Sequence, residues 1–558
     1  MGMDRRARMP LRWSWENEMD ATWEAAAAAY RIREKPRGRH KVRVFAENHA
    51  YLSQVFKCLE TYGEREFIVH EDIRLTFAEC RTQAGRLAHH LANQCAVEPG
   101  DRIGLVLSNS PEWMLSFIAI SAIGAVPALI NARAGADEVN HCLSSTQCRL
   151  CIHQRNDLAA EIDELTLAEA QHILSGQADH PLPETPRGPD DEALLMFTSG
   201  TTGLPKGASL SHEGVLTALK TIEYSGALIA KGMAEAFGID YGTLAGMRPP
   251  PVNLLIFPLF HVSGCHAVFL TSLLQGGKVV LMTRWNAEQA VALMARERVT
   301  AFPAVPTMHR DLLRLETLAE HDLSSLTSLS VGGQATPPAL LADIHRAFPA
   351  AVMGTGYGMT ESNGTVTLMI GSEFINNPRS AGRPVSTVDV EVRDDQGRAL
   401  PAGATGEIHI RGSTLMTGYA NTEQPAFDAD GWFATGDLGY LDEDGLVYIV
   451  DRKTDMVISG GENIYCAEVE RVMDQHPAVR ESAAFGLPDE RLGEKLVATV
   501  VPQADADLTE AALIDHCVSR LAKHKEPKEV RIQRRPLPRN ASGKIIKAKV
   551  REEYLASQ

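Results

Sequence analysis

The chain passes from an apolar run into a small polar loop that closes on a lysine, at Leu195-Met196-Phe197-Thr198-Ser199-Gly200-Thr201-Thr202-Gly203-Leu204-Pro205-Lys206-Gly207. The apolar residues predict a buried strand. Glycines let the backbone approach a ligand, hydroxyl and amide hydrogens point at phosphate oxygens, and the lysine adds a mobile positive charge. We therefore predict that this loop binds the polyphosphate of a nucleotide triphosphate.

The loop differs from two common phosphate-binding patterns. A Walker A loop has Gly directly before its Lys and Ser or Thr directly after it, whereas Lys206 lies between Pro205 and Gly207. The glycines at 354–358 miss the Rossmann spacing by one position. An ordinary polar surface loop is the alternative. The residues expected to contact phosphate are Thr198, Ser199, Gly200, Thr201, Thr202, Gly203 and Lys206.

Apolar strands alternate with amphipathic helices on both sides of this loop. This alternation predicts parallel sheets wrapped by helices, which is an α/β fold. The predicted strands are 102–107, 150–153, 194–198, 253–257, 278–281, 301–304 and 328–331, and the predicted helices are 111–123, 291–298 and 338–348. The apolar segment 113–130 is explained by a helix followed by a buried strand better than by a membrane span.

The character of the sequence changes twice in its second half. After Gly382, short strands at 388–393, 406–411 and 447–450 predict a small β-rich subdomain. From Arg452 onward the chain reads as a compact α+β unit. With 558 residues the chain is long enough for several domains. We divide it into an irregular N-terminal extension at 1–45 with an Ala-rich helical piece, a large domain at 46–451 and a small domain at 452–558.

Charge and cysteine usage narrow the class of protein. The net charge of −16 argues against a nucleic-acid partner. Residues 520–551 carry 12 basic and 2 acidic side chains, which either face phosphates or form a solvated surface. Nine scattered cysteines, with Cys148 and Cys151 expected as buried thiols, predict neither a disulfide framework nor a zinc site. No secretory signal is visible, so we expect a cytoplasmic protein.

A second candidate for nucleotide binding is Tyr357-Gly358-Met359-Thr360-Glu361-Ser362. Tyr357 between Gly356 and Gly358 offers a slot for a flat base, and Thr360 offers a hydroxyl to phosphate. Glu361 is a hard oxygen ligand for Mg²⁺, which usually reaches a protein through one or two carboxylates and its substrate phosphates. A turn with a solvated glutamate is the alternative.

Further polar groups follow toward the C-terminus. Asp437, in Thr435-Gly436-Asp437, is expected in a tight turn where its carboxylate accepts both ribose hydroxyls. Arg452 follows the strand at 447–450 and is expected to reach ribose or phosphate. A glycine turn at Gly460-Gly461-Glu462 would admit a thin substrate past the backbone. Lys544 follows another glycine turn. Taken singly, each is ordinary on a protein surface.

Two segments leave alternatives open. His261, Cys265 and His266 have metal-ligand side chains, but no further ligand is near in sequence, so His261 is better explained as lining or gating a pocket. The segment 224–251 contains five glycines and three consecutive prolines. It is either a flexible cover over the site or a surface insertion.

Six motifs in order resemble the adenylate-forming superfamily of acyl-CoA synthetases, adenylation domains and luciferases. They are 198–207, Pro258-Leu259-Phe260-His261, 357–362, 435–437, 451–463 and 540–544, and the resemblance covers roughly residues 50–550. It implies a large domain that binds ATP, Mg²⁺ and a carboxylic acid, and a small mobile domain that rotates between two half-reactions. Thr454, at the expected pivot, departs from the Asp or Lys of many relatives.

The resemblance also implies roles for individual residues. Lys544 would contact the acid carboxylate and the α-phosphate, Lys206 and Thr360 the leaving pyrophosphate, and Glu361 and Thr201 the metal. His261 would gate a channel for the pantetheine arm of coenzyme A. Asp437 and Arg452 would bind the ribose. The residues expected to line the pocket and flank the adenine are Gly333, Gln334 and Ala335, and those expected to line the channel are Gly460, Gly461 and Glu462.

The leading prediction is an ATP-dependent carboxylate–CoA ligase. The chain ends fourteen residues past Lys544, the segment 459–463 has the form typical of CoA-using relatives, and the approach to the pocket lacks an Asp to clamp an amino acid. Small residues at 332–335, with Ser263 and Gly264, leave room for a long or bulky chain. A hydrophobic acid is therefore the default expectation, either a fatty, a steroid side-chain or an arylalkanoic acid. An aromatic-acid CoA ligase of the benzoate or cinnamate type, an acyl-AMP ligase serving a carrier protein, a luciferase-like oxygenase and a fatty-acid uptake protein with peripheral membrane contact are the alternatives. Similar enzymes are often homodimers.

Overall fold

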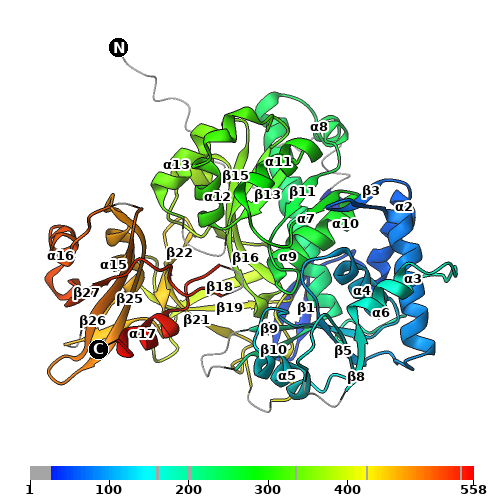
Figure 1. The fold of residues 1–558 in the computed structure, drawn as a ribbon, viewed down its shortest axis with the longest axis horizontal. Helices are drawn as coiled ribbons and strands as arrows, with labels where there is room; N and C mark the ends of the chain where they lie inside the picture. Colours follow the sequence, from blue (N-terminus) through cyan, green and yellow to red (C-terminus); the bar gives the residue numbers. More distant parts are fainter. Residues whose placement is uncertain are drawn as a thin grey trace.

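The computed structural model describes residues 27–158, 162–198, 204–332, 336–422, 425–460, 462–504, 506–540 and 543–557. A large unit precedes Arg452, and a smaller unit, orange to red, follows it (Figure 1). Parallel sheets with covering helices make up most of the large unit, which confirms the predicted α/β fold.

The first large sheet carries the predicted phosphate loop. Its strand order is β20-β10-β9-β6-β5-β7-β8, and β6, β5, β7, β8 and β9 pair in parallel. The chain then turns back from β9 into antiparallel β10. The strands are β5 Arg102–Val106, β6 Val126–Leu129, β7 Leu150–His153, β8 Asp163–Thr166, β9 Glu192–Thr198, β10 Lys206–Ser211 and β20 Gly418–Tyr419.

The second large sheet has the order β17-β16-β15-β14-β13-β11-β12-β3-β4, parallel in its centre and antiparallel at both edges. Its strands are β3 Glu66–His70, β4 Ile73–Thr76, β11 Val252–Leu255, β12 Lys278–Leu281, β13 Ala301–Ala304, β14 Ser328–Val331, β15 Val352–Met359, β16 Gly364–Ile370 and β17 Arg383–Pro384. The strands predicted in both large sheets are confirmed to within a residue or two.

Two smaller sheets lie in the last third of the chain. The predicted β-rich subdomain is an antiparallel sheet, and the C-terminal unit has its own sheet and its own apolar cores. The first sheet contains β18 Val388–Arg393, β19 Gly406–Gly412, β21 Phe433–Leu441 and β22 Val447–Arg452. The second contains β23 Val457–Ser459, β24 Glu462–Ile464, β25 Val479–Asp489, β26 Gly493–Pro502 and β27 Glu529–Ile532.

Helices cover these sheets, and α4 shows how the sequence specifies one of them. Ser110 caps its first turn by accepting a hydrogen bond from the Trp113 amide, Pro111 fits its first position, and Gly124 follows its end at φ +75°. Nearly every side chain of α4 is buried inside the large unit, so the apolar segment is a core helix followed by β6. In the described residues we find no helix of the length and apolarity that crossing a bilayer requires.

The helical elements have the following bounds. They are α2 Cys58–Tyr62, α3 Phe77–Asn93, α4 Pro111–Ala122, α5 Ala136–Ser145, α6 Leu167–Leu174, α7 His212–Phe237, α8 Tyr241–Met247, α9 Val262–Gly264, α10 Thr271–Gln275, α11 Ala287–Glu297, α12 Pro306–Leu313, α13 Pro338–Ala347, α14 Ser372–Asn376, α15 Cys466–Met473, α16 Glu510–Val518 and α17 Lys547–Leu555. Short 3-10 turns lie at η1 Leu52–Lys57, η3 Glu316–Glu320, η4 Thr360–Ser362 and η5 Lys523–Lys525, and η2 Cys265–Leu270 is π-helical.

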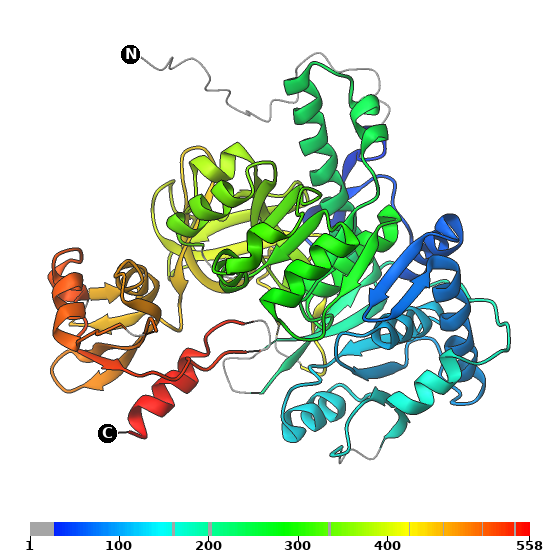
Figure 2. The same ribbon diagram turned by 45° about the horizontal axis from the view of Figure 1, so that its top comes forward.

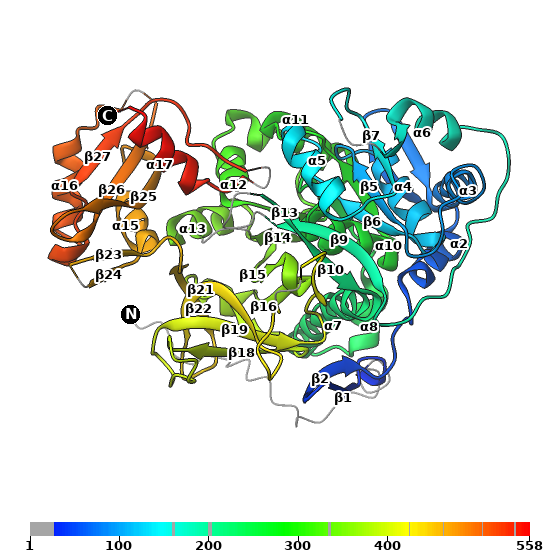
Figure 3. The same cartoon turned by 90° about the horizontal axis from the view of Figure 1, so that it is seen from below.

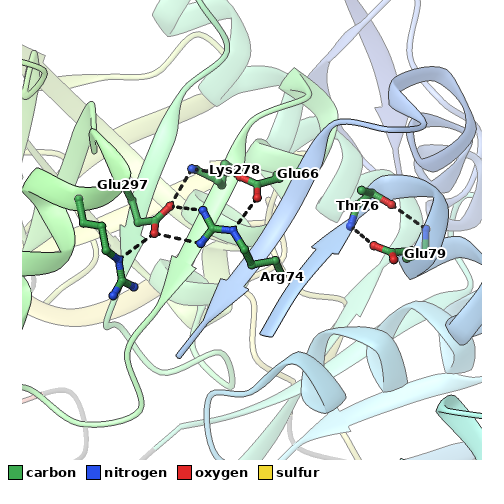
Figure 4. A network of polar contacts seen from close by, with 7 residues as sticks. Glu66, Arg74, Thr76, Glu79, Lys278 and Glu297 are labelled. Carbon is green, nitrogen blue, oxygen red and sulfur yellow. Dashed lines mark hydrogen bonds and ion pairs between the residues drawn. The ribbon is translucent and has the colours of Figure 1, made fainter. Parts of the chain in front are cut away.

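A buried carboxylate ties the edge hairpin β3–β4 to the second sheet (Figure 4). Glu297, at the end of α11, accepts hydrogen bonds from Arg74 of β4 at 2.9 and 3.1 Å and from Lys278 of β12 at 3.0 Å. Its side chain is 2% exposed. The Arg74 hydrogen bonds, with smaller help from Lys278, lower the pKa of Glu297 to about 2 although burial opposes them.

The N-terminal extension is more regular than its sequence suggested. Residues predicted to be irregular form the antiparallel hairpin β1 Ile32–Arg37 and β2 His40–Phe45, with a turn at Gly38. Its strands are fixed by contacts distant in sequence, since Lys35 and Arg37 form ion pairs with Glu213 at 2.7 and 3.1 Å. The part of the extension before residue 27 lies outside the described residues.

The Gly-rich segment 224–251, for which a flexible cover over the site and a surface insertion were both left open, is largely helical. Helix α7 continues through Gly226 and Gly232 to Phe237, and α8 turns back along it. Tyr224 and the small residues that follow on α7 pack against the N-terminal segment, which offsets the modest helix penalty of glycine. The two helices, green in Figure 2, project from the large unit, so the segment is a surface insertion.

Cys148 and Cys151 are buried free thiols, as predicted. Burial raises the pKa of Cys148 to about 11, and the other described cysteines are also free. Within the described residues no group of three His, Cys, Asp or Glu side chains is arranged to hold a metal ion.

Candidate active site

The predicted phosphate loop joins two paired strands. Thr198 ends β9 and lies opposite Lys206, the first residue of β10. The loop residues Ser199, Gly200, Thr201, Thr202 and Gly203 lie outside the described residues. Lys206 is exposed, and its ammonium lies 5.5 Å from the ring centroid of Tyr419 on β20.

Tyr419 links the lysine to the predicted metal carboxylate. Its hydroxyl donates a hydrogen bond of 2.9 Å to Oε1 of Glu361, which lies in the turn η4 with Thr360. Burial, followed by the Glu361 carboxylate, raises the pKa of Tyr419. Sequence reasoning missed this tyrosine, because only the pairing of β20 with β10 brings it to the loop. Lys206 therefore lies over the face of the Tyr419 ring, and Glu361 lies at its hydroxyl.

The donor set at Glu361 fits a magnesium ion held with nucleotide phosphates. The Glu361 side chain is half-buried, and its Oε1 is held by Tyr419. Mg²⁺ commonly uses one or two carboxylates and completes its shell with phosphate and water oxygens. Thr201, the other predicted ligand, lies outside the described residues.

Gly356, Tyr357 and Gly358 belong to strand β15 rather than to a loop. A Cβ at Gly358 would overlap the carbonyl oxygen of Gly364, and one at Gly356 would lie 2.8 Å from the carbonyl oxygen of Thr367. Both glycines are exposed and allow close pairing with β16. The result is an open backbone surface next to the Tyr357 ring.

Asp437 is buried in strand β21, not in the tight turn expected from its sequence. Gly436, at φ +73°, lies where the register between β19 and β21 shifts, and the Asp437 that follows it is buried. Tyr357 donates a hydrogen bond of 2.6 Å to Oδ2 of Asp437, and Arg452 forms an ion pair of 2.7 Å with Oδ1. Each carboxylate oxygen retains a further lone pair, so ribose hydroxyls can still donate to it.

Lys544 reaches this cluster from the C-terminal unit. The Asn540 side chain accepts a hydrogen bond of 2.9 Å from the Lys544 amide, and Gly543 at φ +84° forms the turn. A Cβ at Gly543 would lie 3.8 Å from Val305 of the large unit, and Figure 3 shows the red segment extending toward α12. The surrounding protein lowers the pKa of Lys544, Arg452 lowers it further, and Asp437 opposes the change.

His261 lies within electrostatic range of Lys544. Burial, followed by the charge of Lys544, lowers the pKa of His261 to about 4, so the imidazole is neutral at physiological pH. Asn109, which sequence reasoning missed, fixes the preceding segment. Its side chain donates to the Phe257 carbonyl and accepts from the Leu259 amide, both at 2.9 Å.

Gly264 is small because the backbone lies close to it, not because it leaves space in the pocket. This corrects the use of Gly264 as a sign of a roomy pocket. A Cβ at this position would overlap the Pro258 carbonyl oxygen. Cys265 is buried in the apolar core.

Gly460 and Glu462 lie apart from the other candidates. They flank the turn of the β23–β24 hairpin, where the Gly460 amide donates to the Leu492 carbonyl at 2.7 Å. In Figure 3 this hairpin lies on the side of the C-terminal unit away from the red segment that carries Lys544. Gly461 and the pocket residues Gly333, Gln334 and Ala335 lie outside the described residues.

Comparisons with known proteins agree with this arrangement. Residues 55–420 match the family described as AMP-binding enzyme, and residues 468–544 match the AMP-binding enzyme C-terminal domain. The chain is 34% identical over 502 residues to the long-chain-fatty-acid–CoA ligase FadD13 of Mycobacterium tuberculosis, with 87% of this chain and 94% of the relative covered. It is also 34% identical to a feruloyl-CoA synthase of Amycolatopsis, with 87% and 95% covered.

Solved structures of a CoA synthetase are similar to this chain as well. The o-succinylbenzoate CoA synthetase (MenE) of Bacillus subtilis, in complex with the acyl-adenylate intermediate OSB-AMP, has a TM-score of 0.77 and 29% sequence identity. The match covers 90% of this chain and 98% of that structure. The same enzyme in complex with ATP and a magnesium ion has a TM-score of 0.76.

Proposed function

Because the chain belongs to the AMP-binding enzyme family and to the acyl-CoA synthetase branch of the adenylate-forming superfamily, we propose that the cluster around Asp437, Glu361 and Lys544 is its active site. The protein is an ATP-dependent acyl-CoA ligase that uses Mg²⁺ and takes coenzyme A as co-substrate. The observation that carries the site assignment is that the turn before Lys544, in the C-terminal unit, meets Val305 of the large unit, so that the Lys544 charge acts on His261 and is itself influenced by Asp437 and Arg452.

In the first half-reaction an oxygen of the substrate carboxylate attacks the α-phosphorus of ATP. The bond from that phosphorus to the bridging oxygen breaks, and pyrophosphate leaves. Lys544 offsets the repulsion between the two anions, while Lys206 and Thr360 contact the departing phosphates. Asp437 and Arg452 orient the ribose. Each hydrogen-bond donor or positive charge that is already in position before the reaction typically contributes a factor on the order of 10²–10³ to the rate.

The metal site in this proposal is Glu361, with Thr201 as a second oxygen donor. A bound Mg²⁺ would supply charge neutralisation on the phosphates. Tyr419 orients the Glu361 carboxylate through its hydrogen bond.

In the second half-reaction the thiolate of coenzyme A attacks the acyl carbonyl, and AMP leaves. We assign residues 1–45 as an extension, 46–451 as the adenylation domain and 452–558 as a mobile domain. The β23–β24 hairpin, with Gly460 and Glu462, lies on a different face of the C-terminal unit from the segment with Lys544. A rotation of this unit about Thr454 would turn the Lys544 face away from the large domain and bring the hairpin face toward it, which supports this division. His261, next to Lys544, would open the channel when Lys544 withdraws.

The proposed substrate is a hydrophobic carboxylic acid, such as a medium- or long-chain fatty acid. Apolar residues surround the segment after His261, which supports an apolar acyl pocket. An aromatic acid of the benzoate or cinnamate type is the second candidate, supported by the similarity to feruloyl-CoA synthase. A cytoplasmic location and a homodimer stay predictions.

The experiment is a panel of acids of graded length and ring content, incubated with ATP, Mg²⁺ and coenzyme A. We expect pyrophosphate release with AMP and acyl-CoA formed in equal amounts, and highest kcat/KM for an apolar acid. Accumulation of acyl-AMP despite coenzyme A would instead support a ligase that serves a carrier protein.

A further inference from the structure

Lys544 lies in a narrow turn whose two arms are joined by an antiparallel bridge between Arg539 and Ile545. This part of the chain extends from the C-terminal unit toward α12 of the large unit (Figure 3). A reactive side chain on such a projection is effective only if the backbone that carries it is held in one geometry. The contacts that hold this turn therefore bear on the proposed reaction.

The arms of the turn are anchored by apolar packing. Leu537 before the turn and Val550 after it belong to one buried cluster with side chains of β25 and β26. Ile545 is partly buried and packs against the same cluster. The arms are thus fixed to the sheet of the C-terminal unit, whereas the segment between them extends beyond this cluster toward the large unit.

The peptide group directly before Lys544 is held at both of its polar atoms. The carbonyl oxygen of Gly543 accepts a hydrogen bond of 2.7 Å from Nη1 of Arg539. The Lys544 amide, in the same peptide group, donates one of 2.9 Å to Oδ1 of Asn540. Because a peptide group is planar, these two contacts fix the plane from which the Lys544 side chain starts. Gly543, at φ +84°, would otherwise allow many backbone conformations.

The Arg539 guanidinium is held in turn by strand β25. Its Nη2 forms an ion pair of 3.1 Å with Oε2 of Glu481, whose side chain is 13% exposed. The same Glu481 oxygen accepts a hydrogen bond of 3.3 Å from the Leu537 amide. A guanidinium is planar and its donors have fixed directions, so it can bridge two acceptors in a defined geometry. A chain of direct contacts therefore runs from β25 through Arg539 to the peptide group before Lys544.

From this geometry we propose that Arg539 is a positioning residue for the first half-reaction. Its guanidinium links β25 to the Lys544 turn, so that the Lys544 ammonium meets the α-phosphate and the acid carboxylate in one orientation. Both terminal nitrogens of Arg539 donate to protein acceptors, which favours this indirect role over a contact with substrate. The inference rests on the proposed function, in which Lys544 acts in the first half-reaction only.

Arg539→Gln in the full-length protein tests this role. The two half-reactions are measured separately, as acid-dependent exchange of labelled pyrophosphate into ATP and as acyl-CoA formation from supplied acyl-adenylate. We expect kcat for exchange to fall about tenfold or more, because small misplacements of a reacting group are costly. The KM for ATP and the rate of acyl-CoA formation should stay within about twofold of wild type, since neither depends on Lys544 in the same way.

A double-mutant cycle separates positioning of Lys544 from general support of the fold. In a Lys544→Ala background, Arg539→Gln should lower the residual exchange by less than about twofold, because the group that it positions is gone. Glu481→Gln weakens the same chain of contacts from β25 and should also lower exchange selectively. Arg535→Gln is the matched control, because Arg535 forms an exposed pair of 2.7 Å with Glu553, and it should keep both half-reactions at wild-type rates.

Three results would overturn the inference. They are full exchange activity in Arg539→Gln, an equal loss in both half-reactions, and a loss that is just as large when Lys544 is absent. If Arg539→Gln does not fold, Glu481→Gln decides by the same criteria. Failure of the proposed function looks different, because wild type would then show no pyrophosphate exchange with any acid.

Discussion

At the scale of single residues, the site depends on side chains that hold the reactive groups as much as on those groups themselves. Asp437 is held by Tyr357 and Arg452, and Glu361 is held by Tyr419. Asp437, Glu361 and Lys544 were identified as candidates from the sequence, because the residues next to each of them in the chain form a recognisable motif. Tyr419 and Asn109 carry no such local signal, since only tertiary contacts bring them to the site.

Tyr419→Phe tests the link between the loop lysine and the metal carboxylate. The variant keeps the ring beside Lys206 and removes only the hydrogen bond to Glu361. We expect the Mg²⁺ concentration for half-maximal pyrophosphate release to rise about tenfold, the usual order when a partner of a metal ligand is lost. Tyr440→Phe, on a ring stacked with Tyr448, is the control and should behave as wild type. An unaltered Mg²⁺ requirement in Tyr419→Phe would argue against this role.

At the scale of elements, periodicity predicted the parallel strands well, because buried strands such as β5 and β13 are short apolar runs between turns. Periodicity failed where contacts distant in sequence determine the local structure. The hairpin β1–β2 contains Pro36 and many charges, and its ion pairs with Glu213 lie far along the chain. Alternation of Val42 and Val44 with charged neighbours was the signal for β2. Asp437 was misplaced because Thr-Gly-Asp reads as a turn when it is a distorted strand.

Glu297→Gln tests the tie between β3–β4 and the second sheet. The folded-state pKa of Glu297 lies near 2, below its ordinary value of 4.5, so its contribution to stability is present above about pH 4.5 and is lost as the pH falls toward 2. Since Arg74 and Arg296 remain partly exposed, we expect a loss of about 1–3 kcal/mol in unfolding free energy at pH 7.

Denaturant unfolding between pH 7 and pH 3 measures this effect. The difference between wild type and Glu297→Gln should shrink as the solution becomes acidic. Glu34→Gln, which removes an exposed pair with Lys41, should leave the unfolding free energy close to that of wild type throughout this pH range. A difference that is independent of pH would show that the carboxylate charge is not responsible.

At the scale of the whole molecule, one arrangement of the two units brings Lys544 to the site and keeps the β23–β24 hairpin away from it. The sequence predicted both groups as functional but had no means to place them on different faces of one unit. Thr454 lies between the units, next to Lys453, which pairs with Asp395 and Glu407 at 3.2 and 2.9 Å. These exposed pairs are weak and allow the units to separate.

Thr454→Pro tests the rotation. Proline restricts its own φ and the conformation of Lys453, while the neighbouring amide of Lys453 can keep its hydrogen bond to the Gly436 carbonyl. We expect acid-dependent pyrophosphate release to stay within about threefold of wild type, and acyl-CoA formation from supplied acyl-adenylate to fall more than about tenfold. Thr454→Ala is the control. Equal loss of both half-reactions would contradict a pivot at this position.

The central claim is that Lys206 and Lys544 act on one nucleotide triphosphate from two separate units. Acid-dependent exchange of labelled pyrophosphate into ATP measures this step directly, in wild type and in Lys206→Ala and Lys544→Ala. The account predicts exchange with at least one hydrophobic acid in wild type. In each variant it predicts that the exchange rate falls by a factor of about 10²–10³. Exchange that is absent with every acid, or that survives both substitutions unchanged, would contradict it.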